Sequence, residues 1–333
     1  MAWYRRSHRD LPWRSGRDPY RIWISEVMLQ QTRAQAVIPY YLRFLERFPT
    51  VEALAAAREE EVLTLWSGLG YYSRARNLLR AACGISAAGA FPRRYTELRS
   101  LPGIGDYTAA AIASIAFGEP RAVVDGNVLR VVARIENDAA DIASARTRAR
   151  FRASAESWLD ARDPGTFNQA LMELGATVCL PRNPLCLLCP LASCCQARQH
   201  GTASGLPVKL RRTEPVSLAG VLLIIRSSRG ILLHRREPDA SRMAGFWDLP
   251  SPEDLPAARL GRKLGAFRHT ITHHHYTYTV REAELENGPG GTPEGTLDGA
   301  PDGVLRWFRP AERLGVPLCT TARKGLQLAG PEV

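Results

Sequence analysis

The sequence predicts a helical domain followed by a smaller α+β domain, and three observations lead to this prediction. The chain has 333 residues, enough for two domains that each bury a core. Between residues 34 and 176 the apolar side chains recur at helical spacing. After a polar linker at 201–213 the spacing changes to that of strands. We therefore expect one domain at 1–200 and a second at 214–325. The expected strands cover residues 216–226, 230–235 and 266–280, and a loop rich in Gly, Pro and acidic residues covers 285–303.

The formal net charge is +11, and arginine supplies almost all of the positive charge, because the only lysines are Lys209, Lys263 and Lys324. A basic protein of this kind favours a polyanionic partner, either nucleic acid or a membrane surface. No apolar run is long enough to span a bilayer, and the N-terminal residues lack the apolar core of a signal peptide. We therefore expect a cytoplasmic protein with no membrane association and no structural disulfides.

A glycine-rich turn is expected at Leu101-Pro-Gly-Ile-Gly-Asp-Tyr-Thr108, between short helices at Tyr95–Arg99 and Thr108–Phe117. With Gly103 and Gly105 two residues apart, the backbone N–H groups of the turn point outward and form a site for an anion, where an added Cβ would obstruct the anion's oxygens. Such a helix–hairpin–helix grips a DNA phosphate through its backbone, without reading sequence. The plainer interpretation is a turn with no ligand, because Gly-x-Gly alone is a weak signal.

Two carboxylates stand in settings that suit acid–base chemistry. Glu26 lies among apolar residues in Ile22–Thr32, where burial raises a carboxyl pKa and keeps the group protonated, as a general acid requires. Asp125 follows an apolar stretch and precedes a predicted buried helix, so we expect it to be the N-cap of that helix. Solvent exposure of Glu26 and capping alone by Asp125 are the structural alternatives.

The stretch Ser67-Gly-Leu-Gly-Tyr-Tyr-Ser-Arg-Ala-Arg76 interrupts the helical pattern with glycines, aromatics and arginines. We expect a loop that enters a DNA duplex, with Tyr71 as a wedge in the base stack and with Arg74 and Arg76 on phosphates. A helix start with a packed tyrosine is the alternative.

Five of the seven cysteines lie between residues 179 and 195. Four of them follow the spacing Cys179-x6-Cys186-x2-Cys189-x5-Cys195, and four thiolates in one short, loop-rich segment suit a compact [4Fe–4S] cluster. Structural zinc is the alternative, but it more often uses two pairs of cysteines separated by a longer span. Cys194 is displaced by one residue from this pattern.

Six motifs follow one another in order between residues 11 and 195. They are Leu11-Pro-Trp-Arg14, Ser25-Glu-Val-Met-Leu-Gln-Gln-Thr32, Gly68-Leu-Gly-Tyr-Tyr72, Val124-Asp-Gly-Asn-Val128, Phe167-Asn-Gln-Ala170 and the cysteine spacing. In these motifs the first 200 residues closely resemble the helix–hairpin–helix DNA glycosylases with an iron–sulfur cluster, the endonuclease III superfamily, and within it the adenine DNA glycosylases. The resemblance implies an all-α domain of two helical lobes with the active site between them, followed by a MutT-like (Nudix-like) domain. It implies a monomeric repair enzyme that removes adenine opposite 8-oxoguanine, or opposite guanine, in double-stranded DNA.

The resemblance also implies roles for individual residues. Glu26 would protonate the imidazole-ring nitrogen of a flipped adenine and later assist the attack of water, while Asp125 would stabilise the oxocarbenium-like transition state or bond to it transiently. Tyr107 and Asn127 would support them as polar groups. Trp13, Arg14, Leu29 and Gln169 would line the adenine pocket, and Gln31, Thr32, Tyr71, Gly103, Gly105, Arg74 and Arg76 would contact DNA.

The second domain resembles the MutT-like domain at Gly220-Val-Leu-Leu and at Gly245-Phe-Trp-Asp-Leu-Pro250. It lacks the acidic, metal-binding Arg-Glu-x-x-Glu-Glu helix of pyrophosphohydrolases with that fold, so recognition rather than hydrolysis is expected. Residues 266–275 align with the lesion-reading loop of the family, with Ile271-Thr272-His273 in place of Phe-Ser-His. We expect the Thr272 hydroxyl to read the lesion and His273 to hold a phosphate. Alternating strand residues and an adventitious metal site are the alternatives.

Three other functions stay open on the sequence alone. A glycosylase and lyase for oxidised pyrimidines, of the endonuclease III kind, would carry a lysine two residues after the last glycine of the hairpin, where this chain has Tyr107. A redox protein with incidental DNA affinity would need neither Glu26 nor Asp125. A catalytically dead damage binder would bind lesion duplexes without releasing base.

Overall fold

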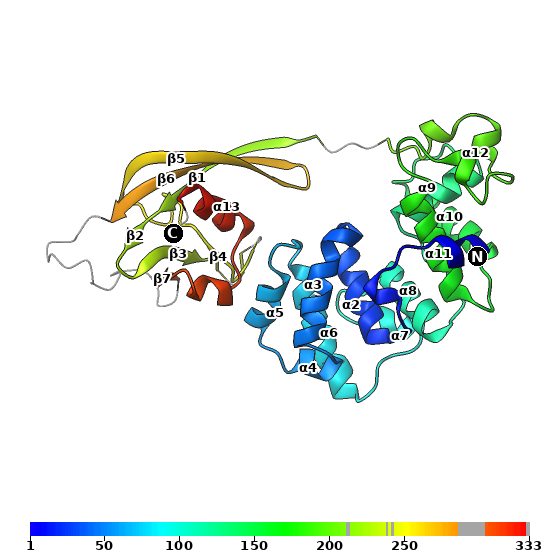
Figure 1. The fold of residues 1–333 in the computed structure, drawn as a ribbon, viewed down its shortest axis with the longest axis horizontal. Helices are drawn as coiled ribbons and strands as arrows, with labels where there is room; N and C mark the ends of the chain where they lie inside the picture. The colour runs from blue at the N-terminus through cyan, green and yellow to red at the C-terminus, as the bar shows by residue number, and fades with distance from the viewer. Residues whose placement is uncertain (211–213, 238, 241–242, 286–303, 331–333) are drawn as a thin grey trace. The chain divides into compact units, whose positions relative to one another are not determined.

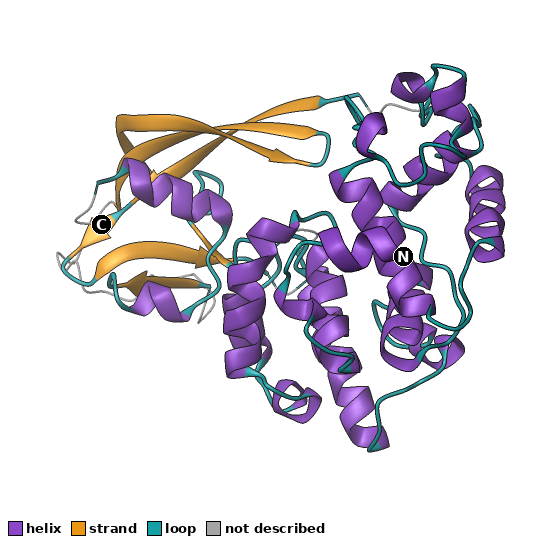
Figure 2. Ribbon diagram, turned by 45° about the vertical axis from the view of Figure 1, so that its right-hand side comes forward, coloured by secondary structure: helices purple, strands orange, loops and turns teal. Residues whose placement is uncertain are grey.

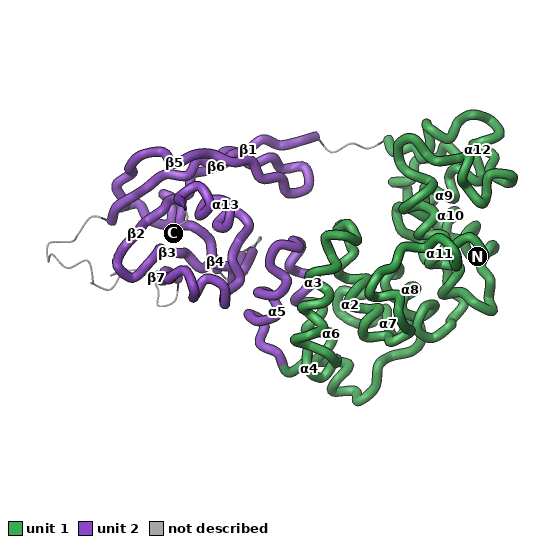
Figure 3. Tube along the Cα trace, in the orientation of Figure 1, with its two compact units in different colours: residues 1–56, 77–212 green, residues 57–76, 213–333 purple. Residues whose placement is uncertain are grey.

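The structure is a computed structural model that describes residues 1–210, 214–237, 239–240, 243–285 and 304–330. The loop expected at 285–303 and the last residues of the linker lie almost wholly outside the described residues. The chain divides into two compact units (Figure 3), of which one comprises residues 1–56 and 77–212 and the other residues 57–76 and 213–333. The predicted fold class is confirmed: helices form the first part of the chain, and strands dominate the second (Figure 2).

The first unit is helical (Figure 1). Its helices are α1 (Ala2–Ser7), α2 (Pro19–Leu29), α3 (Ala34–Arg47), α4 (Val51–Ala55), most of α6 (Ser73–Ala88), α7 (Tyr95–Arg99), α8 (Asp106–Phe117), α9 (Gly126–Ile135), α10 (Ala145–Ser157), α11 (Pro164–Thr177) and α12 (Gln196–Gln199). Short 3-10 turns are η1 (Pro12–Arg14), η2 (Cys186–Leu188) and η3 (Ala203–Gly205).

Local sequence sets the ends of these helices. The Asp18 carboxylate accepts a hydrogen bond from the Tyr20 N–H at 2.9 Å, and Pro19 opens the first turn of α2. Helix α8 ends at Gly118, whose φ of 70° gives the left-handed cap that glycine allows. The predicted helix at 95–99 is confirmed, and α8 begins two residues before the expected Thr108.

The core of the first unit lies where α9 packs against α10 and α11. Its buried members include Val128, Val131, Val132, Phe151, Leu171 and Leu174. Helix α8 also contacts α2, α7 and α11, because its small residues allow close approach. These contacts fix the N-terminal ends of α8 and α9, where Tyr107 and Asp125 lie.

The second unit contains two sheets. One has the order β1-β6-β5, with β1 (Val216–Ile224) parallel to β6 (His274–Leu285), and with β5 (Ala258–Ile271) antiparallel to β6. In the other, β3 (Gly230–Arg235) pairs antiparallel with β2 (Arg226–Ser227), β4 (Trp247–Asp248) and β7 (Leu305–Phe308). Leu223, Ile225, Leu232 and Ala283 form a buried core.

Helices complete the second unit. They are α5 (Glu59–Trp66), the first turn of α6, η4 (Glu312–Gly315) and α13 (Thr320–Leu328). Helix α13 packs against β1, β4 and β5. None of the helices in the described part of the chain is long and apolar enough to cross a membrane.

Candidate functional site

The predicted glycine-rich turn joins α7 and α8. Gly103 has a φ of 75°, and a Cβ on it would lie 2.5 Å from Cβ of Asn77. Besides the expected approach of an anion, the backbone conformation and the Asn77 contact therefore also favour glycine at this position. Gly105 has nothing within 4 Å of such a Cβ, so its side of the turn is open.

Glu26 is buried in α2, with 5% of its surface exposed. Its Oε2 accepts a hydrogen bond of 2.5 Å from the Tyr107 hydroxyl at the start of α8. Burial raises the pKa of Glu26 to about 7, and the negative charge of Asp125 adds to the rise, while the Tyr107 hydrogen bond opposes it. A carboxyl with this pKa is protonated in a large fraction of molecules at neutral pH.

Asp125 is the N-cap of α9, as the sequence predicted. Its Oδ1 accepts from the Val128 N–H at 2.7 Å, and its Oδ2 accepts from Asn127 Nδ2 at 2.8 Å. Burial raises the pKa of Asp125 above its usual value, although both hydrogen bonds favour the charged form. Asp125 also raises the pKa of Glu26 and of Tyr107, so these three groups interact electrostatically.

Arg130, which the sequence analysis missed, extends this network along α9. Its Nη2 donates to Asn127 Oδ1 at 2.9 Å and to the Gly175 carbonyl at 2.7 Å, and its Nε donates to the Cys179 carbonyl at 2.7 Å. Only 8% of Arg130 is exposed. The available signal was an arginine amid the apolar residues of a predicted buried helix.

One of the residues expected around an adenine pocket, Arg14, binds a second buried carboxylate, Glu173. Arg14 Nη2 donates to Glu173 Oε2 at 2.8 Å, and Arg9 binds both oxygens at 2.8 Å. Burial of Glu173 favours its neutral form, but the hydrogen bonds from Arg9 and Arg14 prevail and lower its pKa to about 2. The sequence analysis identified Arg14 and missed Arg9 and Glu173.

The other expected pocket residues belong to the same unit. Gln169, half-buried in α11, accepts a hydrogen bond from the Tyr4 hydroxyl at 3.1 Å. Trp13 is 8% exposed and meets the Tyr41 ring edge-on at 5.4 Å between centroids. Leu29 is half-buried at the end of α2.

Gln31 and Tyr71, expected to enter the duplex, and Thr272, expected to read the lesion, share an unusual backbone conformation. The φ angles of Gln31, Tyr71 and Thr272 are 59°, 51° and 54°. Few non-glycine residues adopt this left-handed region, and such conformations cluster at functional sites. All three residues are exposed, whereas the neighbouring Thr32 is half-buried and its hydroxyl donates to the Gln30 carbonyl at 3.4 Å.

The structure gives both Arg74 and Arg76, the arginines expected on phosphates, partners within the protein. Arg74 is 8% exposed, its Nη2 donates to the Gly70 carbonyl at 3.0 Å, and burial lowers its pKa to about 10. Arg76 binds the Glu59 carboxylate at 2.8 Å and donates to the Ala244 carbonyl. Both guanidinium groups thus have protein partners that connect them to the loop and to residues 59 and 244.

Thr272 and His273 form the two-residue turn between β5 and β6, since Ile271 pairs with His274. The Thr272 hydroxyl donates to the Ile271 carbonyl at 2.7 Å and lies 3.3 Å from His273 Nδ1. The strands predicted here are confirmed, and both residues lie at the tip of the hairpin rather than within a strand.

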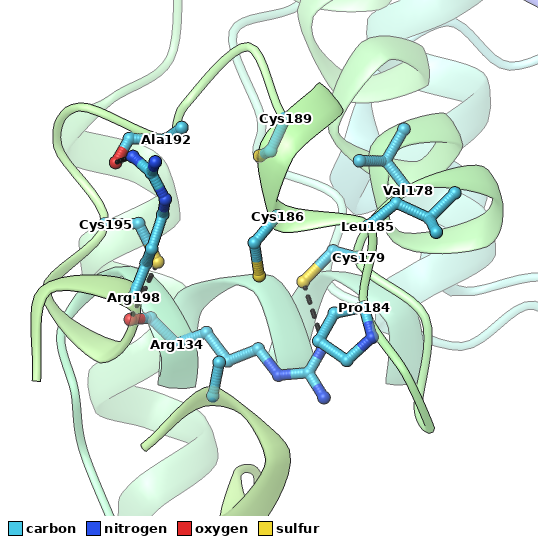
Figure 4. A pocket seen from close by; sticks show the side chains of 11 residues that line it. Arg134, Val178, Cys179, Pro184, Leu185, Cys186, Cys189, Ala192, Cys195 and Arg198 are labelled. Atoms are coloured by element: carbon cyan, nitrogen blue, oxygen red, sulfur yellow. Dashed lines mark hydrogen bonds between the residues drawn. The ribbon is translucent and has the colours of Figure 1, made fainter. Parts of the chain in front are cut away.

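Four cysteines expected as metal ligands line one pocket, together with Arg134 and Arg198 (Figure 4). They are Cys179, Cys186, Cys189 and Cys195. Arg134 is 1% exposed and donates to the Cys179 sulfur at 3.2 Å. Within the described residues, no group of three His, Cys, Asp or Glu side chains is arranged around a single metal ion. Cys194 is exposed and outside the pocket lining.

Comparisons with known proteins identify the family of the chain. The family model "HhH-GPD superfamily base excision DNA repair protein" matches residues 24–157. The adenine DNA glycosylase of Homo sapiens is 35% identical over 399 residues, which cover 97% of this chain and 72% of that protein. The adenine DNA glycosylase of Buchnera aphidicola subsp. Baizongia pistaciae is 41% identical over 241 residues, covering 71% of this chain and 68% of that protein.

Solved structures support the fold of the helical part. A thermostable thymine-DNA glycosylase matches with a TM-score of 0.53 and 29% identity, covering 60% of this chain and 93% of that chain. A non-covalent endonuclease III–DNA complex matches with a TM-score of 0.51 and 24% identity, covering 60% and 92%, and shows the fold alone. On the full-length similarity above, the chain belongs to the adenine DNA glycosylase family within the HhH-GPD superfamily of base excision DNA repair proteins.

Proposed function

We propose that this adenine DNA glycosylase excises adenine paired with 8-oxoguanine or guanine in double-stranded DNA, acting as a monomer. The observation that carries the proposal is the pair of carboxyls, Glu26 and Asp125. Glu26 has its pKa raised to about 7 by burial, and Asp125 has hydrogen bonds from Val128 and Asn127 that favour its anion. Hydrolysis of a glycosidic bond uses one carboxyl as the proton donor and a second carboxyl as an anion, and these two residues can take the two roles.

In the proposed mechanism Glu26 donates its proton to the imidazole-ring nitrogen of the flipped adenine. The bond between the sugar and the base then breaks, its electron pair leaves with the neutral adenine, and the sugar becomes an oxocarbenium-like cation. The Asp125 carboxylate stabilises this cation or bonds to it transiently. The Glu26 carboxylate next accepts a proton from the attacking water, which regenerates the acid. Tyr107 holds Glu26 Oε2 and Asn127 holds Asp125 Oδ2 in place.

Binding of the flipped adenine is assigned to Trp13, Arg14, Leu29 and Gln169. The Glu173 carboxylate fixes the Arg14 guanidinium, and the Tyr4 hydroxyl fixes the Gln169 amide oxygen. Gln31, Thr32 and Tyr71 fill and hold the opened base stack, and the N–H groups around Gly103 and Gly105 hold a phosphate. Positioning of this kind lets one pocket both select adenine and orient it for protonation.

Recognition of the opposite base is assigned to the hairpin tip. 8-Oxoguanine differs from guanine by a carbonyl oxygen and a ring N–H. The Thr272 hydroxyl donates its proton to the Ile271 carbonyl, which leaves its oxygen to accept from that ring N–H. His273 is assigned to a DNA phosphate.

The four pocket cysteines are assigned to a [4Fe–4S] cluster. The donor set fits, because four cysteine side chains line one pocket and cysteine thiolates are the usual ligands of such a cluster. When bound, the cluster cross-links residues 179–195 and so stabilises the loop. The Arg130 bond to the Cys179 carbonyl connects this loop to Asn127 and Asp125.

Metal analysis tests this assignment with adjacent variants. The purified protein should contain about four irons per chain. Cys195→Ser should lose iron, because its sulfur faces the pocket, and Cys194→Ser should keep it, because its sulfur lies outside. Zinc in place of iron, or iron loss in Cys194→Ser alone, contradicts the assignment.

Base release from an adenine:8-oxoguanine duplex tests the proposed function. Asp125→Asn should abolish release while retaining much of the affinity for lesion DNA, because it removes a charge that only the cationic transition state needs. Glu26→Gln should do the same by removing the proton donor. Release at a near wild-type rate by either variant refutes its assigned role.

A further inference from the structure

Residues 57–76 lie within the sequence of the glycosylase domain but form one compact unit with residues 213–333 (Figure 3). This segment comprises α5, the loop 67–72 and the first turn of α6. Tyr71, the proposed duplex wedge, is in the loop. The contacts that anchor this segment therefore bear on where the wedge stands.

Ser67, at the start of the loop, is hydrogen-bonded to two residues of the C-terminal segment 318–323. The residue is 4% exposed, and its hydroxyl donates to the Leu318 carbonyl at 2.9 Å. The same hydroxyl accepts from Arg323 Nη2 at 2.8 Å, and the Ser67 carbonyl accepts from Arg323 Nη1 at 3.4 Å. The Ser67 side chain thus uses both its donor and its acceptor on these partners.

The other end of the loop has its own anchors. The Tyr72 ring packs against the Phe246 ring in a tilted arrangement, with 4.1 Å between centroids, and both side chains are buried. Arg76 Nη2 donates to the Ala244 carbonyl. Two C-terminal segments, 244–246 and 318–323, thus hold the loop from both ends.

These two C-terminal segments are tied to each other by Asp248. Its carboxylate, 2% exposed, accepts from the Thr321 hydroxyl at 2.9 Å and from Arg236 Nη2 at 3.1 Å. The Cys319 N–H donates to the Trp247 carbonyl at 2.9 Å. The anchoring surface is therefore a fixed part of the C-terminal fold, because charged, buried hydrogen bonds are costly to break.

Hydrogen bonds and backbone conformation within the loop also fix the position of Tyr71. The Gly70 carbonyl accepts from Trp66 Nε1 at 3.2 Å and from Arg74 Nη2 at 3.0 Å. Gly68 and Gly70 have φ angles of 111° and 74°, and Tyr71 follows at 51° with 41% of its surface exposed. Such a loop holds its exposed ring in one place when its two ends are fixed.

We propose that Ser67, Tyr72 and Arg76, bound to Arg323, Phe246 and the carbonyls of Leu318 and Ala244, form an anchor through which the C-terminal region positions Tyr71 in the base stack. These are positioning residues, since they act through Tyr71. The proposal rests on the proposed function, in which Tyr71 enters the duplex and the C-terminal region reads the base opposite adenine. The anchor then couples reading of that base to opening of the stack.

The test uses the full chain with Arg323→Met, which removes both bonds to Ser67. The matched control is Arg226→Met, because Arg226 Nη2 donates to the Ala329 carbonyl at 2.7 Å in the same region and does not take part in the anchor. Stack opening is followed by the fluorescence of 2-aminopurine placed beside 8-oxoguanine, and adenine release is followed under single turnover. Arg323→Met should slow both by about tenfold, the effect of losing a charge-assisted bond, and Arg226→Met should leave both unchanged.

A double variant separates positioning from general damage to the fold. If Arg323 acts through Tyr71, Arg323→Met combined with Tyr71→Ala should be no slower than Tyr71→Ala alone. Additive losses, or wild-type behaviour of Arg323→Met, overturn the proposal. If Tyr71→Ala has no effect while Glu26→Gln is inactive, the wedge role fails and the coupling fails with it, but the proposed chemistry stands.

Hydrogen exchange in the free protein provides a readout that needs no DNA. Peptides that cover Gly68–Tyr72 should exchange faster in Arg323→Met than in the wild type or in Arg226→Met, while peptides that cover Glu26 should be unchanged. Equal protection of the loop in Arg323→Met and wild type also overturns the proposal.

Discussion

The pKa values of two buried glutamates in this protein are shifted in opposite directions, and the charges of their neighbours explain the difference. Glu26 has a hydroxyl partner and a nearby carboxylate, so burial prevails and raises its pKa to about 7. Glu173 has two arginines within 2.8 Å, and they lower its pKa to about 2. Burial alone therefore does not make a general acid, because the charge of the partners decides.

The sequence could predict Glu26 but could not predict the state of Glu173. The apolar neighbours of Glu26 are adjacent in sequence within α2. The partners of Glu173, Arg9 and Arg14, lie about 160 residues away in the chain. Contacts of this range follow from the packing of the unit and not from any local pattern.

The raised pKa of Glu26 predicts a pH-dependent cost to stability. The folded state binds this proton more tightly than the unfolded state, so the cost appears as pH rises from about 4.5 to about 7 and persists above that range. Glu26→Gln should therefore be more stable than the wild type at pH 8, by on the order of 3 kcal/mol, and should lose this advantage below about pH 4.5. Urea unfolding at the two pH values measures the difference. Glu46→Gln, at an exposed position, is the control. Equal stability of Glu26→Gln and wild type at pH 8 would show that burial of the Glu26 carboxylate does not destabilise the folded protein.

At the scale of elements, the two carboxyls that we propose as catalytic lie on helices whose ends are set by local sequence. Asp125 caps α9, and the turn before α8 places Tyr107 in its first turn. Caps and glycine turns involve residues within four positions of one another, and the sequence therefore predicts them. The same rules give the β5–β6 hairpin but not the strain at its tip. A β-branched residue at a φ of 54° runs against the preference for glycine at the first position of such a turn.

The strained turn predicts opposite effects of one substitution on stability and on recognition. Thr272→Gly should relieve the left-handed conformation and slow hydrogen exchange in β5 and β6 by about fivefold, or about 1 kcal/mol. It should also narrow the discrimination between adenine:8-oxoguanine and adenine:guanine by about tenfold or less, because one hydroxyl is lost. Thr272→Ser keeps the hydroxyl and should keep the discrimination. Loss of stability in Thr272→Gly would show that the left-handed conformation of Thr272 is not strained. Unchanged discrimination would show that the Thr272 hydroxyl does not read the lesion.

At the scale of the whole molecule, the division into units does not follow the order of the chain. The sequence places residues 57–76 in the first domain because stretches with the helical pattern of that domain lie on both sides of them. Their packing partners are far along the chain, as in the bond between Ser67 and Leu318, 251 residues apart. Removal of the C-terminal region would therefore expose Ser67 and Tyr72 as well as deleting the hairpin. Point substitutions such as Thr272→Gly and Arg323→Met are needed to separate the two effects.

The distribution of lysine makes a last prediction about the reaction outcome. A lyase forms an imine between a protein amine and the sugar, and this needs a nucleophilic lysine. No lysine precedes Lys209, and the residue two positions after the last hairpin glycine is Tyr107, whose hydroxyl is bonded to Glu26. We expect release of adenine to leave an intact strand that breaks only on treatment with alkali or heat. Borohydride should trap little protein on the DNA, in contrast to a lysine-dependent glycosylase tested in parallel. Efficient trapping would contradict a monofunctional reaction, and Lys209→Arg would then show whether the lysine nearest in sequence forms the imine.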